Sequence, residues 1–390
     1  GSTAHPPDRT RFPEFMGRAV RYAGIEAGGT TWVVAIAQGC PTNITERAEF
    51  PTTTPEIVLG QVVEWFSSRQ FDCLGVACFG PIDLHRATSS KWGFITTTPK
   101  PGWRHTDVLG PIKAGLKLNN DFPVAFDTDV NAPAFAEYMA AREEGLEFSS
   151  CAYVTVGTGV GVGLVLNGAP LRGMLHGEGG HISVPRLSGD EAISGISGGS
   201  GVGTGSNWAG VEAMCNSAAL AERAGCSAPQ LQDLPDNHPV WDTAAHYLAC
   251  MCANMILLVS PERIVLSGGV LKRSVLFEKI RARTVQYLNG YIDMPRLRSV
   301  EACADLIVPS RWKNDAGIIG ALFLAKRVHD DRRQGNLGKQ FRQFGTSGAY
   351  AAKPSPKSVT FSSTTVAGVF MAGLLTGCLL MRCKEHKRQT

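Results

Sequence analysis

The sequence contains no Cys-x-x-Cys pair, although eleven cysteines are scattered along its 390 residues. An odd number of cysteines, most of them inside apolar stretches, fits a reducing compartment better than a framework of disulfide bonds. The net charge is only +4, and no stretch combines clustered Lys and Arg with interleaved aromatic residues. These absences argue against a small disulfide-rich domain and against a protein that binds nucleic acid.

Two common nucleotide-binding motifs are also missing. No Gly-x-x-x-x-Gly-Lys-Ser/Thr segment occurs, which excludes a P-loop. The glycine-rich run from Gly157 to Gly163 falls between two expected strands and not before a helix, so it is no dinucleotide-binding fingerprint. The chain nevertheless has 44 glycines, and they cluster in a way that favours loops approaching phosphate groups.

The most informative stretch runs from Phe126 to Ala132. An apolar, strand-like run precedes it, and a helical pattern follows it to about Glu144. Asp129 therefore lies where a strand ends and a helix begins, which is where α/β folds bind ligands. We predict that Asp129 is a general base that orients an attacking hydroxyl and accepts its proton. The alternative is that Asp127 or Asp129 only caps the helix.

Two glycine- and threonine-rich turns of the same design each connect a pair of expected strands. Gly28-Gly29-Thr30 joins residues 22–26 to 32–37, and the turn with Thr158 and Gly159 joins 152–156 to 162–166. Either turn alone could be a plain β-turn. As a pair, they could present backbone N–H groups to the two ends of a polyphosphate.

Several polar groups could bind a sugar. Glu178 and His181 lie three residues apart in a glycine-rich bend, and such a pair can bond vicinal hydroxyls, although a lone histidine is usually structural. The loop 96–105 contains three threonines and Trp103; it either lines a sugar site or is a surface loop whose tryptophan fills a gap. Gly268-Gly269 ends a strand and could let an adenine and ribose approach the backbone.

These motifs resemble those of the ROK sugar kinases, and most closely their ATP-dependent fructokinases. The resemblance runs in order from about Tyr22 to Val328. It rests on the segments 24–30, 79–81, 98–105, 128–132, 157–161, 178–181, 267–270 and 314–317.

The resemblance implies an actin/hexokinase-like α/β fold of two domains that phosphorylates a hexose, D-fructose above all, with Mg-ATP. It gives Asp129 the role of catalytic base and Glu26 that of holding Mg²⁺ through water. The implied ATP and phosphate contacts are Gly28, Gly29, Thr30, Thr158, Gly159, Gly268 and Gly269. The implied sugar contacts are Gly80, Pro81, Asp129, Glu178, His181 and Glu212. The alternative is a non-catalytic sugar-sensing or scaffold protein on the same fold.

The chain departs from the family at its zinc loop. Many bacterial relatives bind zinc with the histidine that corresponds to His181 and a Cys-x-x-His-x-x-Cys run, but residues 196–210 contain no Cys or His. Thr204, Asn207 and Gly210 stand roughly at the ligand positions. Even if His176 turned inward, two imidazoles would leave half of the metal shell to water, so we expect no structural zinc.

The expected organisation is a leader (1–21) without a secretory signal, an N-terminal α/β domain (22–131), a C-terminal α/β domain (132–314) and a closing helix (315–328). A polar linker (329–358) should follow. Residues 359–381 contain no charged side chain and precede a basic tail (382–390), which predicts a transmembrane anchor and a kinase domain in the cytosol. The spacing of Gly373 and Gly377 would suit a homodimer, while a buried or interfacial helix is the alternative.

Overall fold

The computed structural model describes residues 18–190 and 208–334. Most of the expected leader, the linker beyond residue 334, the predicted anchor 359–381, the basic tail, Thr204 and Asn207 lie outside the described residues. The chain divides into a unit of residues 1–337 and a unit of residues 338–390, and all described residues belong to the first.

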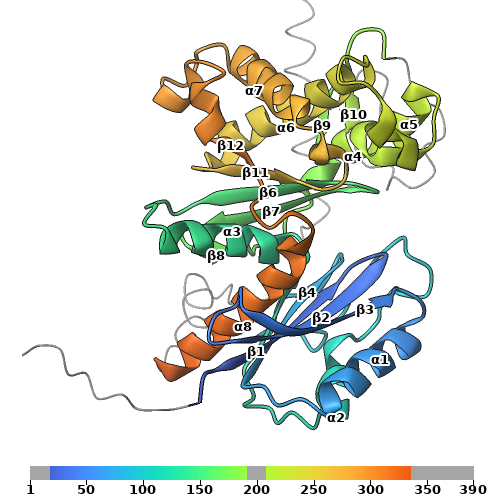
Figure 1. Cartoon of the computed structure of the whole chain (residues 1–390), viewed down its shortest axis with the longest axis vertical. Helices are drawn as coiled ribbons and strands as arrows, with labels where there is room; N and C mark the ends of the chain where they lie inside the picture. Colours follow the sequence, from blue (N-terminus) through green and yellow to red (C-terminus); the bar gives the residue numbers. More distant parts are fainter. Residues whose placement is uncertain (1–17, 191–207, 335–390) are drawn as a thin grey trace, which may run out of the picture. The chain divides into compact units, whose positions relative to one another are not determined.

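Two five-stranded sheets form the framework of this first unit (Figure 1). The first sheet has the order β3-β2-β1-β4-β5, and the second has the order β12-β11-β6-β7-β8. The strands of the first sheet are β1 (Arg21–Ala27), β2 (Thr31–Gln38), β3 (Ile44–Pro51), β4 (Cys73–Cys78) and β5 (Val124–Thr128). Those of the second are β6 (Cys151–Val156), β7 (Val160–Leu166), β8 (Ala169–Pro170), β11 (Ile264–Ser267) and β12 (Ile307–Pro309).

The two sheets repeat one topology. In each, an antiparallel three-stranded meander is followed by two parallel strands: β1 pairs parallel with β4, and β6 pairs parallel with β11. The repeat explains why both glycine- and threonine-rich turns occur between the first two strands of a sheet. A separate two-stranded sheet is made by β9 (Ser183–Pro185) and β10 (Trp208–Gly210).

Helices cover the sheets. The longer helices are α1 (Pro55–Ser67), α3 (Asn131–Glu143), α6 (Val240–Val259), α7 (Val275–Leu288) and α8 (Ala316–Arg333). The shorter ones are α2 (Leu109–Gly115), α4 (Val211–Cys215), α5 (Ser217–Ala224) and the 3₁₀ turn η1 (Gly179–His181). Helix α8 packs on β1 and β4, helix α3 packs on β6 and β7, and the two helices pack on each other.

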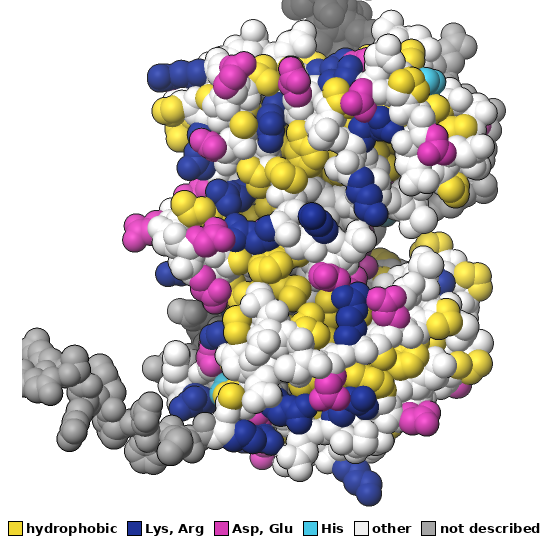
Figure 2. Space-filling model, in the orientation of Figure 1, with side chains coloured by type: hydrophobic (Ala, Val, Ile, Leu, Met, Phe, Trp, Pro, Cys, Tyr) yellow, Lys and Arg dark blue, Asp and Glu magenta, His cyan; other side chains and the backbone are white. Residues whose placement is uncertain are grey.

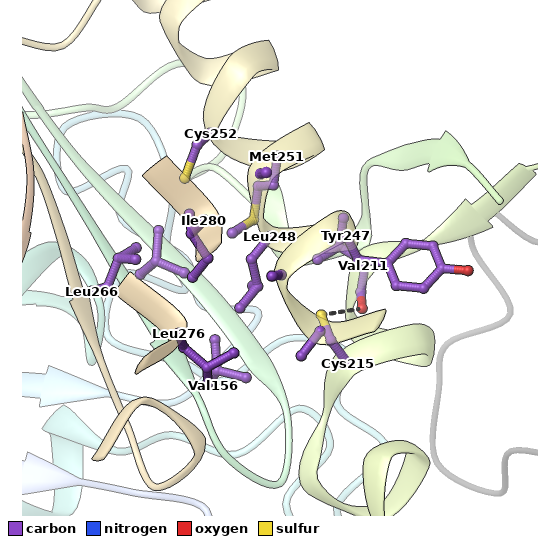
Figure 3. Close-up of a cluster of buried hydrophobic side chains, with 14 of the residues drawn as sticks. Val156, Val211, Cys215, Tyr247, Leu248, Met251, Cys252, Leu266, Leu276 and Ile280 are labelled. Carbon is purple, nitrogen blue, oxygen red and sulfur yellow. Dashed lines mark hydrogen bonds between the residues drawn. The ribbon is translucent and has the colours of Figure 1, made fainter. Parts of the chain in front are cut away.

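Three apolar clusters follow from this arrangement. One lies between the first sheet and α1, where Val58, Val62 and Phe66 repeat at helical spacing and are all buried. A second surrounds α3 and α8. The third lies between the second sheet and α6 and α7, where Leu276 lies beside Val156 (Figure 3). Burial of apolar surface in these clusters is the main force that holds the elements together.

The crossing of α3 and α8 depends on a glycine. A Cβ atom at Gly320 would lie 2.4 Å from the carbonyl carbon of Ala132, which is closer than real Cβ contacts come. The absent side chain therefore lets α8 approach the first turn of α3, which begins just after Asp129.

Most expected elements are present, with two differences. The last helix continues to Arg333, so residues 329–333 of the expected linker are helical. Trp103 is fully buried beside Trp32 and Phe79, and its indole N–H donates to the carbonyl oxygen of Thr53 at 2.9 Å. Trp103 thus belongs to the core and does not line an open sugar site, which supports the second alternative for its loop.

One helix within 18–190 and 208–334, α6, is long and apolar enough to cross a membrane by length and composition alone. Its apolar side chains, Leu248 and Met251 among them, fill the third cluster, so α6 is a core helix (Figure 3). On the face seen in Figure 2, basic and acidic side chains are interspersed.

Candidate active site

Asp129 directly follows the end of β5. Its backbone N–H donates to the carbonyl oxygen of Cys78 at 3.0 Å, which extends the pairing of β4 and β5 by one residue. The side chain of Asp129 does not cap α3; instead the Thr128 hydroxyl accepts from the N–H of Asn131 at 2.9 Å. The capping alternative for Asp129 therefore finds no support, and its carboxylate is available for chemistry.

The negative charge of Asp129 affects two other carboxyl groups, those of Glu26 and Glu178. Burial raises the pKa of Asp129 to about 6. Burial and then the negative charge of Asp129 raise the pKa values of Glu26 and Glu178, each to about 7. Carboxyl groups with pKa values raised by desolvation and like charge are typical of functional sites.

Glu26 is on β1, and its carboxyl group lies against the first turn of α8. A backbone hydrogen bond from Ile318 lowers its pKa against the larger effect of burial. Gly317 leaves room for this carboxyl, because a Cβ atom there would lie 2.2 Å from the Glu26 carboxyl carbon. No group of three or more His, Cys, Asp and Glu side chains among the described residues could hold a metal. A Mg²⁺ ion fits Glu26 all the same, because Mg²⁺ keeps several waters and takes few protein oxygens.

Asp127 has a structural role. It is fully buried and accepts from Arg172 Nη2 at 2.7 Å and from Asn131 Nδ2 at 2.9 Å. Asn131 in turn accepts from the N–H of Leu164 on β7 at 3.0 Å. The residues around Asp129 are thus tied both to β7 and to the segment that follows β8.

The two turns expose the groups that were predicted to bind phosphate. Gly29 and Thr30 are exposed in the first turn, which Gly28 closes by donating from N to the carbonyl oxygen of Thr31 at 3.1 Å. Thr158 is exposed in the second turn. Their roles in binding ATP stay predictions.

Gly268 follows β11 and lies next to the end of β6, the strand that leads into the turn with Thr158 and Gly159. Its φ is +97°, and a Cβ atom would come within 2.4 Å of the carbonyl oxygen of Val156, the last residue of β6. Only glycine suits this position. A Cβ atom at Gly269 would meet no atom within 4 Å, so a ligand can reach the backbone at the end of β11. A loop that binds a nucleotide requires such access.

The predicted sugar contacts form a connected group. His181 Nε2 lies 4.0 Å from Glu178 Oε2, and His181 Nδ1 lies 3.9 Å from Glu212 Oε1. Glu212 Oε2 accepts from the N–H of Val160 at 3.0 Å. Glu212 therefore connects His181 to the second phosphate turn, so its carboxylate is already partly occupied by the backbone.

Gly80 and Pro81 follow β4 at the same edge of the sheet as Asp129. The carbonyl oxygen of Pro81 accepts from Thr96 twice, at 2.7 Å from the backbone N–H and at 3.0 Å from the hydroxyl. The N–H of Ile82 donates to His176 Nε2 at 3.1 Å. This contact and the Arg172–Asp127 pair were missed from the sequence, where the only signal was a histidine and an arginine close to the glycine-rich bend.

The residues do not fit a zinc site of the family type. Gly210 ends β10 and has no donor side chain, and the carboxylates of Glu178 and Glu212 lie about 4 Å from the His181 ring, at 4.0 and 3.9 Å. Instead, Asp190 accepts from Arg223 at 2.8 and 3.0 Å and from the hydroxyl of Tyr247 at 2.5 Å. Arg223 also donates to the carbonyl oxygen of Met214 at 2.8 Å, so this network holds α4, which carries Glu212.

Comparison with known proteins gives a consistent result. Residues 22–328 match the ROK family. The chain is 35% identical over 302 residues to the fructokinase of Pediococcus pentosaceus, covering 77% of this chain and 96% of that protein. It is 33% identical over 307 residues to the fructokinase of Lactococcus lactis subsp. cremoris, covering 79% and 97%.

Among solved structures, the ROK hexokinase from Thermus thermophilus matches with a TM-score of 0.61 and 23% identity, covering 80% of this chain and all of that one. The duplicated sheets and their carboxylate site thus define a hexokinase-like α/β fold. The chain belongs to the ROK family, as its motifs predicted.

Proposed function

We propose that this protein transfers the γ-phosphoryl group of ATP to the 6-hydroxyl of D-fructose. That the chain is an ATP-dependent hexose kinase follows from its family; the choice of fructose is the proposal. The placement of Asp129 supports the phosphoryl transfer: a half-buried carboxylate with a pKa of about 6 at the end of β5, whose charge is felt by Glu178 and Glu26. Identity to proteins named fructokinase supports the choice of sugar.

The chemistry follows from these positions. Asp129 accepts the proton of the sugar hydroxyl, whose oxygen forms a bond to the γ-phosphorus while the bond to the β–γ bridging oxygen breaks and ADP leaves. Glu178, His181 and Glu212 orient the sugar ring. Backbone N–H groups of the turns at Gly29–Thr30 and Thr158–Gly159 bind the phosphates. Glu26 would hold Mg²⁺ through water, and the ion supplies neutralising charge for the phosphate oxygens.

A coupled assay of ADP release tests the proposal with fructose, glucose, mannose and N-acetylmannosamine. We expect kcat/KM for fructose to exceed the other values at least tenfold, which corresponds to about 1.4 kcal/mol of transition-state binding. A larger kcat/KM for glucose than for fructose would make glucose the preferred substrate, and the protein would still be a hexose kinase. Binding of a sugar without ADP release would favour the non-catalytic alternative.

We also propose that residues 359–381 anchor the protein in a membrane, with the kinase domain in the cytosol. The uncharged run and the basic residues after it, beginning with Arg382, support this. Full-length protein should stay with membranes after carbonate extraction, and a variant lacking residues 360–390 should be soluble. Extraction of the full-length protein into the soluble fraction would overturn the anchor.

A further inference from the structure

The segment 171–178 follows β8 of the second sheet, where the N–H of Leu171 donates to the carbonyl oxygen of Leu164, but several of its other polar contacts are with residues next to the first sheet. The carbonyl oxygen of Leu171 accepts from Asn131 Nδ2 at 3.3 Å, and Arg172 pairs with Asp127. The carbonyl oxygen of Gly173 lies 3.1 Å from His85 Nε2. The segment that leads to Glu178 is therefore fastened along its length to residues around β5 and to the loop after β4.

His176 makes the last of these contacts, and its geometry fixes its protonation. The side chain is 3% exposed, and its Nε2 lies 3.1 Å from the N–H of Ile82. A backbone N–H can only donate, so Nε2 must carry a lone pair and the ring proton must be on Nδ1. Burial lowers the pKa of His176, which keeps the ring neutral and this tautomer intact.

The protonated Nδ1 faces the sugar site. It lies 3.3 Å from Glu178 Oε1 and 3.3 Å from the carbonyl oxygen of Gly177. Nδ1 donates its hydrogen bond to the carbonyl oxygen of Gly177, and because the ring is neutral, its close approach to Glu178 Oε1 is a polar contact and not an ion pair. A donor that bonds the residue before Glu178 and touches its carboxylate restrains a side chain that is itself 44% exposed.

Gly80 provides the space for the ring. A Cβ atom at position 80 would lie 3.3 Å from His176 Nε2 and 3.1 Å from the backbone nitrogen of Ile82. Both ends of the imidazole therefore meet a part of the chain that we assign to sugar binding.

We propose that His176 is a positioning residue for the hexose site: it holds the Glu178 carboxylate at a fixed place relative to the Gly80–Pro81 loop. The inference rests on the proposed function, because Glu178 must contact the sugar. His176 itself need not touch substrate; it acts through Glu178. The expected signature is a change in KM for the hexose, with kcat and KM for ATP nearly unchanged.

Two isosteric variants separate the two contacts of the ring. In His176→Asn the side-chain amide nitrogen can replace Nδ1 as the donor beside Gly177 and Glu178 but cannot reach Ile82. In His176→Gln the amide oxygen can replace Nε2 as the acceptor from Ile82 but leaves Gly177 and Glu178 without that donor. We expect His176→Gln and His176→Leu to raise KM for the hexose roughly 10-fold, and His176→Asn to raise it no more than about 3-fold.

His246→Leu is the matched control. His246 is also a buried histidine, 8% exposed, but it bonds Tyr287 and the carbonyl oxygen of Pro185 on the other side of the second sheet. It should lower the melting temperature without raising KM. If His176→Gln keeps the wild-type KM, or if all three His176 variants change KM alike, the proposal fails.

A measurement that does not depend on catalysis can test the role of His176 separately from the proposed kinase activity. The ¹⁵N NMR spectrum of ring-labelled wild-type protein should show His176 as the neutral Nδ1–H tautomer between pH 6 and 8. An Nε2–H ring or an imidazolium would overturn the positioning role even if the kinase is active. Conversely, if no hexose caused ADP release, the proposed function would be wrong, even if His176 were found in the Nδ1–H tautomer.

Discussion

Arg172 and Asp127 form an ion pair in which the Asp127 side chain is fully buried while the Arg172 side chain is 41% exposed, with Nη2 and Oδ2 2.7 Å apart. The pair connects β5, two residues before Asp129, to the segment that leads to Glu178. One contact thereby holds the segments that carry Asp129, the proposed base, and Glu178, a proposed sugar contact.

Arg172→Met should destabilise the protein by about 2 kcal/mol, because Asp127 would stay buried without its charged partner. Urea denaturation measures the change. Arg298→Met is the control: its pair with Asp293 is 64% and 81% exposed and should contribute less than about 0.5 kcal/mol. Equal losses in the free energy of unfolding would show that the buried Arg172–Asp127 pair contributes no more to stability than an exposed ion pair.

Asp129→Asn should lower kcat by at least ~10²-fold while the sugar still binds, because the amide keeps the shape of the carboxylate but cannot accept the proton. The assay of ADP release gives kcat, and calorimetry gives the affinity for sugar. Asp121→Asn, on an exposed loop, is the control. Turnover of Asp129→Asn within a few-fold of the wild type would refute its role as base.

The acid limb of the pH–rate profile should lie near pH 6. Burial raises the pKa of Asp129 to about 6, and a general base must be ionised to act. We expect kcat/KM to fall about tenfold per pH unit below that point. A profile that is flat between pH 5 and 7 would contradict the assignment.

Glu26→Gln should change how stability depends on pH. The folded-state pKa of Glu26 is about 7, above the ordinary value of about 4.3 for an unfolded chain, so the folded protein binds the extra proton. Its contribution to stability is complete below about pH 4 and is lost as the pH rises through 7.

The wild-type melting temperature should therefore fall relative to that of Glu26→Gln as the pH rises from 4 to 8. Thermal melts of both proteins across this range measure it, with the exposed Glu56→Gln as the control. Parallel curves for wild type and Glu26→Gln would show that this carboxyl is not desolvated.

Chelation should leave the melting temperature unchanged, whereas Arg223→Met should lower it by several degrees. The Arg223 and Asp190 side chains are only 10% and 11% exposed, so breaking their pair leaves a buried charge. Thermal melts with and without chelator measure both effects. Elemental analysis that finds about one zinc per chain after dialysis would refute the prediction that no structural zinc is bound.

Local patterns sufficed for much of the fold. Strand ends, both glycine- and threonine-rich turns and the start of α3 could be read from apolar runs and from Gly, Thr and Asp at fixed offsets. Asp129 was located in this way because its position depends only on where β5 ends.

Contacts between distant segments could not be read in the same way. His176 meets Ile82 across 94 residues, and Arg172 meets Asp127 across 45. Both lie in a loop without periodicity, so only the three-dimensional path of the chain reveals their partners. The end of α8 was placed too early because Asp330, Asp331 and the arginines after them look like linker, yet ion pairs such as Lys326–Asp330 extend the helix.

The two glycines in the first turn and a half of α8 have a genetic consequence. Gly317 makes room for Glu26, and Gly320 makes room for the residue that follows Asn131. An added methyl group at position 317 would push on the Glu26 carboxyl group, and one at position 320 would push on the backbone in the first turn of α3, just after Asp129. In a saturation screen for growth on a hexose, positions 317 and 320 should be as intolerant as position 129, although neither residue has a side chain with which to touch a substrate.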